Sequence, residues 1–150
     1  MTAPLRIGIL GAAGITPNSL IAPAAGNPSV GLTAVAARNR ARAEEFAAAH
    51  GIARVLDSYE DVLADPDIDA VYIPLPNSEH GRWTVAAADA GKHVLVEKPF
   101  ASNLAGAEAV AAHVAESGLV VMEAFHYRYH ALMAEVLRLV RRLSAAGISS

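Results

Sequence analysis

The chain opens with an apolar stretch that runs directly into a turn made only of glycine and alanine, within residues 6–15. The β-branched and apolar residues before the turn predict a buried strand, and the turn leaves nothing bulky between backbone and ligand. Such a turn lets amide groups approach a pyrophosphate and directs the next helix N-terminus at its charge. Gly11, Ala13 and Thr16 occupy the positions of the G-x-G-x-x-G/A fingerprint, and we expect Gly14 to adopt a positive φ. The alternative is a tight turn in an unrelated α/β protein.

Composition limits the fold and the partners. The 150 residues suffice for one domain with a hydrophobic core. A net charge of -3, with no long block of like charge, indicates no nucleic-acid or anionic membrane partner. The absence of cysteine excludes disulfides and fits a cytoplasmic location. No apolar run approaches the ~18 residues of a membrane span, so we expect neither secretion nor membrane insertion.

Strand and helix patterns alternate along the chain, which predicts an α/β fold with a doubly wound parallel sheet and helices on both faces. The first helix is expected to be short or kinked because of Pro23. Further strands are predicted at 31–37, 54–56, 69–73, 92–97 and 118–123. Helices are predicted at 40–50, after Ser58, from a cap at Asn77 or Ser78 to Gly91, and at 104–117.

The residues at the end of the second predicted strand indicate whether such a site prefers NAD or NADP. An adenosine ribose would lie there, and NAD-preferring sites usually place an acidic residue beside it. This sequence has Ala37 and Arg38 instead. A guanidinium binds a 2′-phosphate that a carboxylate would repel, so the sequence favours NADP over NAD. The alternative is that Arg38 is an ordinary solvated residue at a strand end.

Two more loops follow strands at the edge where ligands bind in open α/β sheets. In segment 74–80, two prolines flank Leu75 and stiffen the chain. Glu97-Lys98-Pro99 follows the next strand. Lys98 is expected to point into the ligand crevice, where its ammonium could bond a sugar hydroxyl and the nicotinamide region. The alternative for this tripeptide is an ordinary charged loop.

Several stretches, in their order and spacing, resemble the glucose-fructose oxidoreductase / inositol dehydrogenase (Gfo/Idh/MocA) family. They are Gly-Ile-Leu-Gly-Ala-Ala-Gly-Ile, Ala-Ala-Arg, Pro-Leu-Pro-Asn-Ser-Glu-His, Glu-Lys-Pro, and Met-Glu-Ala-Phe-His-Tyr-Arg-Tyr-His. Within the family the chain is most similar to NADP-dependent sugar and dihydrodiol dehydrogenases. The resemblance implies a Rossmann-type domain of an NADP-dependent oxidoreductase. The reaction implied is hydride transfer between nicotinamide and a hydroxyl-bearing carbon of a sugar, polyol or cyclic diol.

The resemblance also implies roles for individual residues. The implied cofactor-binding set is Gly11, Ala12, Ala13, Gly14, Ile15, Arg38, Leu75, Asn77, His80, Glu97, Lys98, Pro99 and Arg128. Arg38 would hold the 2′-phosphate, and Arg128 would lie near the nicotinamide and substrate. Lys98 is the implied catalytic residue, which would orient the substrate hydroxyl and assist proton transfer. Burial of Lys98 beside the nicotinamide would favour the neutral form of its amine.

The C-terminal part departs from the family pattern. Residues 1–130 are expected to form the NAD(P)-binding domain, and residues 131–150 an amphipathic linker helix with an unpatterned tail. The helix is predicted over 131–143, with an apolar side of Leu132, Met133, Val136, Leu137 and Val140. The family's second α+β domain, which completes the substrate pocket, is expected to be absent. The alternative function is a truncated, non-catalytic NADP-binding module that dimerises through this helix.

Other chemistries have weaker support in the sequence. Glu123, His126 and His130 suggest zinc, because histidines four apart share a helical face. The resemblance accounts for these residues without a metal, so no metal site is expected. No Gly-x-Ser-x-Gly elbow supports a hydrolase. The expected partners are a small-molecule substrate and, in the alternative function, a second copy of the chain.

Overall fold

Six parallel strands form the centre of the computed structural model, which describes residues 3–145. The strands are Leu5–Leu10 (β1), Val30–Ala36 (β2), Arg54–Val55 (β3), Ala70–Ile73 (β4), His93–Val96 (β5) and Val121–Glu123 (β6). They lie in the order β3-β2-β1-β4-β5-β6, which is the strand order of the Rossmann fold. The predicted doubly wound parallel sheet is confirmed. In this topology, ligands bind outside the carboxyl ends of β1 and β4, where the strand order reverses.

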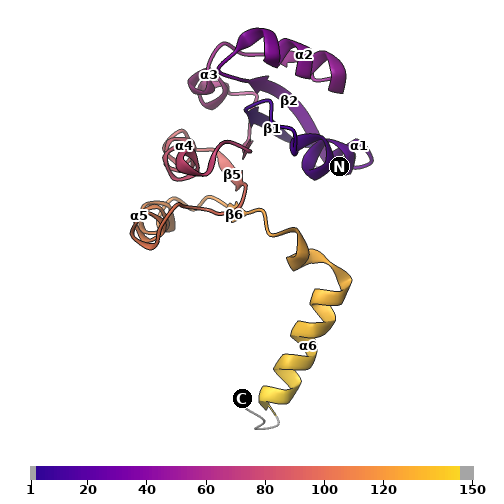
Figure 1. Cartoon of the computed structure of the whole chain (residues 1–150), viewed down its shortest axis with the longest axis vertical. Coiled ribbons are helices and arrows are strands. Elements are labelled where there is room, and N and C mark those ends of the chain that lie inside the picture. Colours follow the sequence, from indigo (N-terminus) through magenta and orange to yellow (C-terminus); the bar gives the residue numbers. More distant parts are fainter. Residues whose placement is uncertain (1–2, 146–150) are drawn as a thin grey trace.

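Helices connect the strands and follow each of them along the chain (Figure 1). They are a π-helical turn Pro17–Ile21 (η1), Ala22–Ala25 (α1), Arg40–His50 (α2), Tyr59–Ala64 (α3), Asn77–Asp89 (α4), Leu104–Ala115 (α5), a 3-10 turn His126–Tyr129 (η2) and Ala131–Ala145 (α6). Ser58 caps α3 as predicted, and Asn103 caps α5. The predicted side-chain cap of α4 is wrong. Pro76 occupies the position before the helix, and Asn77 is already its first helical residue.

The hydrophobic core has two parts, one on each face of the sheet. Val62 of α3 and Trp83 of α4 pack against one face. Leu20 of η1 and Ala47 of α2 pack against the other. Neighbouring residues of β1 and β2 contribute to opposite clusters, as the alternation of side chains along a strand requires. The helices on both faces therefore hold the carboxyl ends of the strands in a fixed arrangement.

The chain after β1 forms a short and irregular helix. The Ala22 N–H donates to the Pro17 carbonyl, which gives a wide π turn, and α1 then continues through Pro23. A proline inside an α-helix lacks a donor and collides with the carbonyl four residues earlier, and the wider turn relieves this collision. The predicted short or kinked helix is confirmed, although it passes Pro23 instead of ending there.

Helix α6 extends away from the sheet (Figure 1). It ends at Ala145, two residues beyond the predicted 143, and residues 146–150 of the predicted tail lie outside the described residues. Its predicted apolar side is present and largely exposed, through Leu132, Val136, Leu137 and Val140. Within residues 3–145, no helix combines the length and apolar character that crossing a membrane requires.

Gly8 of β1 provides a test of the packing between the sheet and α3. A Cβ at this position would lie 2.6 Å from Val62 Cγ1 and 2.9 Å from Ile68 Cδ1. Gly8→Ala should therefore lower the free energy of unfolding by about 1–3 kcal/mol, measured by urea denaturation. Gly31→Ala is the matched control, because Gly31 lies on the paired strand β2 and its Cβ would meet nothing within 4 Å. Equal stability of the two variants would contradict tight packing at Gly8.

Candidate functional site

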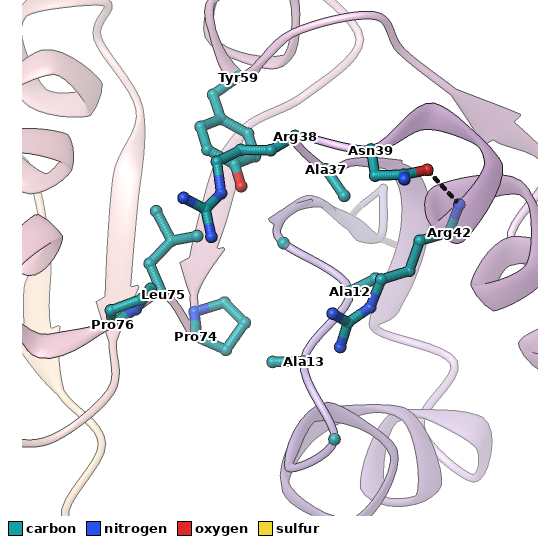
Figure 2. Close-up of a pocket in the computed structure, with 12 residues that line it drawn as sticks. Ala12, Ala13, Ala37, Arg38, Asn39, Arg42, Tyr59, Pro74, Leu75 and Pro76 are labelled. Carbon is teal, nitrogen blue, oxygen red and sulfur yellow. Dashed lines mark hydrogen bonds between the residues drawn. The ribbon is translucent and has the colours of Figure 1, made fainter.

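A cavity of about 660 Å³ lies at the carboxyl ends of β1, β2 and β4 (Figure 2). Its lining comes from the turn after β1, from the end of β2 with the start of α2, from α3, and from the loop after β4. These residues are Gly11, Ala12, Ala13, Gly14, Ala37, Arg38, Asn39, Arg42, Tyr59, Pro74, Leu75 and Pro76. Ile15, predicted with the turn, is exposed and does not line the cavity. The volume suits a small-molecule site, and the position is the switch point of the sheet.

Gly11 shapes the turn at the centre of the cavity. Its backbone φ of 114° lies in a region that residues with a Cβ rarely adopt. A Cβ here would also lie 2.9 Å from Leu75 Cδ2. The expectation of a positive φ at Gly14 is wrong. The chain turns as soon as it leaves β1, where the Gly11 N–H donates to the Ala36 carbonyl at 2.7 Å, so Gly11 needs the conformational freedom.

Two exposed arginines, Arg38 and Arg42, line the cavity where β2 ends. Figure 2 shows the guanidinium of Arg42 directed toward the turn of Ala12 and Ala13, while Arg38 lies beside the ring of Tyr59. No aspartate or glutamate is among the lining residues that the structure describes. The cavity therefore presents two cations and no carboxylate at the place where an NAD-preferring site usually has an acid.

Arg42 was not predicted as a site residue. The available signal was its nearness to Arg38 in the sequence, since Arg42 is the third residue of α2 and lies in the first turn of that helix. Asn39 fixes this helix start, because its Oδ1 accepts the Arg42 N–H at 3.1 Å. Tyr59 closes the cavity on the same side. Burial raises the pKa of Tyr59, and a hydrogen bond with the backbone of Arg38 opposes this shift.

The loop after β4 forms the opposite wall of the cavity. Leu75 and its two flanking prolines line it, whereas Asn77 and His80 do not. Asn77 is exposed at the start of α4. His80 is fully buried, with Nε2 2.7 Å from the Leu75 carbonyl oxygen and Nδ1 2.7 Å from the Pro99 carbonyl oxygen. The imidazole therefore contacts the backbone of two loops and does not face the cavity.

Glu97-Lys98-Pro99 follows β5, next to the loop after β4. None of the three residues lines the cavity beside Gly11. Glu97 is buried, whereas Lys98 and Pro99 are exposed. The expected burial of Lys98 was beside a bound nicotinamide, and it stays a prediction. The segment follows the carboxyl end of β5, and the Lys98 side chain is exposed there within residues 3–145.

Tyr72 of β4 joins Glu97 to the helix after the glycine turn. Its hydroxyl donates to Glu97 Oε1 at 2.6 Å and lies 2.8 Å from Ser19 Oγ. The single hydroxyl hydrogen of Ser19 can go either to Tyr72 or to the Ile15 carbonyl, whose oxygen lies 3.0 Å from Ser19 Oγ. Burial, followed by the hydrogen bond to Glu97, raises the pKa of Tyr72 far above its usual value. The sequence analysis missed Tyr72, whose only signal was a hydroxyl within a buried aliphatic strand.

The other predicted residues lie apart from the cavity. Arg128 of η2 lines a separate hollow with residues of α6. Two of the candidate zinc ligands have other contacts. Glu123 accepts the Phe100 N–H at 2.8 Å, and His126 lies 4.0 Å from a Glu97 oxygen. Among residues 3–145, no group of three histidine, aspartate or glutamate side chains is placed to hold a metal ion.

The strand order, the glycine turn and the cavity at the switch point define a Rossmann-type nucleotide-binding domain. The sequence model of an oxidoreductase family with an NAD-binding Rossmann fold matches residues 5–125. The chain belongs to this family, the Gfo/Idh/MocA oxidoreductases, which confirms the resemblance found in the sequence.

Relatives with assigned activities are similar to the chain over nearly its whole length. D-xylose 1-dehydrogenase (NADP(+)) 2 of Haloferax volcanii is 43% identical over 145 residues, which are 97% of this chain and 44% of the relative. The dTDP-3,4-didehydro-2,6-dideoxy-alpha-D-glucose 3-reductase of Streptomyces antibioticus is 41% identical over 150 residues, covering 95% of this chain and 45% of the relative.

A solved structure is similar over the same region. KijD10, a 3-ketoreductase from Actinomadura kijaniata crystallised with NADP and TDP-benzene, gives a TM-score of 0.84 at 34% identity. The match covers 93% of this chain and 42% of KijD10. The chain thus spans less than half the length of these three relatives.

The Tyr72 hydroxyl offers a test of the network beside the cavity. Tyr72→Phe leaves the buried Glu97 carboxyl without its 2.6 Å donor, so the free energy of unfolding should fall by about 1–3 kcal/mol. Tyr127→Phe removes a hydroxyl from a residue that is 57% exposed, and it should change the free energy of unfolding by less than about 0.5 kcal/mol. Chemical denaturation measures both variants. A Tyr72→Phe protein as stable as Tyr127→Phe would rule out a stabilising role for the hydrogen bond.

Proposed function

We propose that the cavity binds NADP(H) and that the chain is the nucleotide-binding part of an oxidoreductase. The proposed reaction is hydride transfer between nicotinamide and a hydroxyl-bearing carbon of a sugar, polyol or cyclic diol. The observation that carries the proposal is the pair of guanidinium groups, Arg38 and Arg42, in a cavity whose lining residues include no carboxylate. The names of relatives that use NADP(+) and the NADP complex of KijD10 support it.

The residues of the cavity fit the groups of a dinucleotide. The turn at Gly11 has no side chain above it, and Ala12 and Ala13 add only methyl groups, so a pyrophosphate could approach the backbone closely. Arg38 and Arg42 would hold the 2′-phosphate through charge-assisted hydrogen bonds. We therefore assign Gly11, Ala12, Ala13, Gly14, Arg38 and Leu75 to the cofactor, and we add Arg42.

The proposed chemistry takes place at the carboxyl edge of β4 and β5. When bound, the nicotinamide supplies or accepts the hydride. We assign Lys98 to the substrate hydroxyl, to which its ammonium would donate a hydrogen bond and with which it would exchange the proton. Ile15 remains assigned to the pyrophosphate and dinucleotide backbone. Asn77, Glu97, Pro99 and Arg128 remain assigned to the nicotinamide side of the cofactor.

We also propose that residues 1–130 are the nucleotide-binding domain and that the helix after them leads to a second domain. The exposed apolar side of α6 and the coverage of less than half of each of the three relatives support this division. A second domain would cover Lys98 and complete the substrate pocket. The exposed face of α6 also favours the second candidate function, a non-catalytic cofactor-binding module that dimerises through this helix.

Cofactor preference tests the role of the arginines. The chain should bind NADPH more tightly than NADH by at least roughly tenfold, about 1.4 kcal/mol, because only NADPH carries the 2′-phosphate. Arg38→Asp should abolish this preference, and Arg42→Ala should reduce NADPH affinity more than NADH affinity. Arg141→Asp, on the exposed surface of α6, is the charge-matched control and should preserve the preference. Fluorescence titration measures the affinities, and equal binding of both cofactors by the unaltered chain would remove the case for Arg38.

Lys98→Ala tests the assignment of the catalytic residue in a longer protein that carries this domain and a second domain. NADPH affinity should be largely retained, while kcat should fall by about 10²–10⁴, the usual contribution of a positioned proton donor or acceptor. Steady-state kinetics and cofactor titration separate the two effects. An unchanged kcat would refute the role of Lys98. If the 150-residue chain binds NADPH and oxidises no polyol, sugar or diol, the non-catalytic function describes the chain by itself.

A further inference from the structure

Both ring nitrogens of His80 face backbone carbonyl oxygens. Nε2 lies 2.7 Å from the oxygen of Leu75, and Nδ1 lies 2.7 Å from the oxygen of Pro99. A carbonyl oxygen only accepts, so each contact is a hydrogen bond only when the ring nitrogen carries a hydrogen. A neutral imidazole has one N–H and would set the lone pair of its other nitrogen against the second carbonyl oxygen. The imidazolium form, with a hydrogen on both nitrogens, satisfies both contacts.

We propose that His80 is held as an imidazolium and acts as a positioning residue that ties together the loops after β4 and β5. The ring has no exposed surface, so it acts on the site only through the groups that it contacts. Those groups are the backbones of Leu75 and Pro99, one in each loop. Hydrogen bonds from a charged donor are stronger than those from a neutral one, which suits a fixed tie between two loops.

Each of these two carbonyls belongs to a segment that matters to the site. The side chain of Leu75 lies over Gly11, where a Cβ would come within 2.9 Å of Leu75 Cδ2. Pro99 directly follows Lys98, the proposed catalytic residue. The same ring therefore fixes one wall of the cavity and the start of the loop that carries the lysine. The Ser102 hydroxyl, which donates to the Asn77 carbonyl at 3.3 Å, adds a longer tie between the same segments.

The carboxylates on the adjoining segments are engaged with other partners, and the exposed ammonium of Lys98 carries the same sign of charge as an imidazolium. On α4, Glu79 lies 3.6 Å from a guanidinium nitrogen of Arg82. Glu97 at the end of β5 and Glu123 of β6 accept hydrogen bonds from Tyr72 and from the backbone of Phe100. In the part of the chain that the structure describes, none of these carboxylates forms an ion pair or a hydrogen bond with the imidazole. The two carbonyl dipoles are thus the groups placed to stabilise its charge.

Nitrogen NMR of the ¹⁵N-histidine-labelled chain tests the charge directly. At neutral pH, both ring nitrogens of His80 should give signals of hydrogen-bearing nitrogens, and no signal of the unprotonated, pyridine type should be present for this residue. The measurement uses the unaltered protein, with His80 assigned through its backbone, so it does not depend on a variant that folds. A pyridine-type nitrogen in His80 at neutral pH would overturn the proposal.

His80→Gln tests the positioning role, because one amide nitrogen cannot reach both carbonyl oxygens, which the two nitrogens of the ring contact separately. Amide hydrogen exchange in segments 75–80 and 98–103 should become at least about tenfold faster, the effect of losing one hydrogen bond to a charged donor. His113→Gln is the matched control, since His113 is a half-exposed histidine on α5 paired with Asp89 at 2.8 Å. Unchanged exchange in both segments of a folded His80→Gln protein would overturn the positioning role.

Cofactor titration extends the test to the site and rests on the proposed function. NADPH affinity of His80→Gln should fall by about tenfold, and that of His113→Gln should equal the unaltered chain. If the unaltered chain does not bind NADPH, the proposed function fails, while the nitrogen spectrum and the exchange rates still decide the role of His80. If His80→Gln exchanges faster yet binds NADPH as tightly as the unaltered chain, the proposed link between this ring and the cavity wall is wrong.

Discussion

The cavity depends on the close approach of Gly11 to Leu75. The turn after β1 must bend at once, and the side chain of Leu75 occupies the space that any Cβ at position 11 would need. Gly11 also donates its N–H to Ala36 at the end of β2. Gly11 therefore lies against the loop after β4 on one side and is hydrogen-bonded to the end of β2 on the other. The backbone at this point stays open on the side where the sheet topology places a ligand.

Charge adds selectivity to this geometry. The chain as a whole carries a formal net charge of -3, yet the charged side chains that line the cavity are two arginines. A local concentration of positive charge in an acidic protein favours an anionic ligand at that place and not across the surface. The parallel strand order sets this position, because it puts the end of β2 beside the glycine turn.

The sequence predicted the elements whose limits depend on local chemistry. Helix α2 begins after the Asn39 cap and ends before Gly51, whose φ of 69° favours a residue without a Cβ, and both bounds match the prediction. It did not predict features that depend on contacts between distant segments. The choice of Gly11 over Gly14 for the positive φ is set by Leu75 and β2, and the burial of His80 by a carbonyl 19 residues away. To predict that Arg42 lines the cavity, one would need to know which face of α2 lies toward the turn after β1.

The resemblance to the family assigns His80 and Lys98 to the same region, but their surroundings give them different physical roles. His80 has no exposed surface, so it acts only by holding the two backbones that it bonds. Lys98 is exposed, and an ammonium in water gains little from a neighbouring dipole or charge. Its proposed chemistry therefore needs a covering surface that residues 3–145 do not supply. Since the cavity with its two arginines is formed without such a surface, we expect cofactor binding and turnover to be separable properties of this domain.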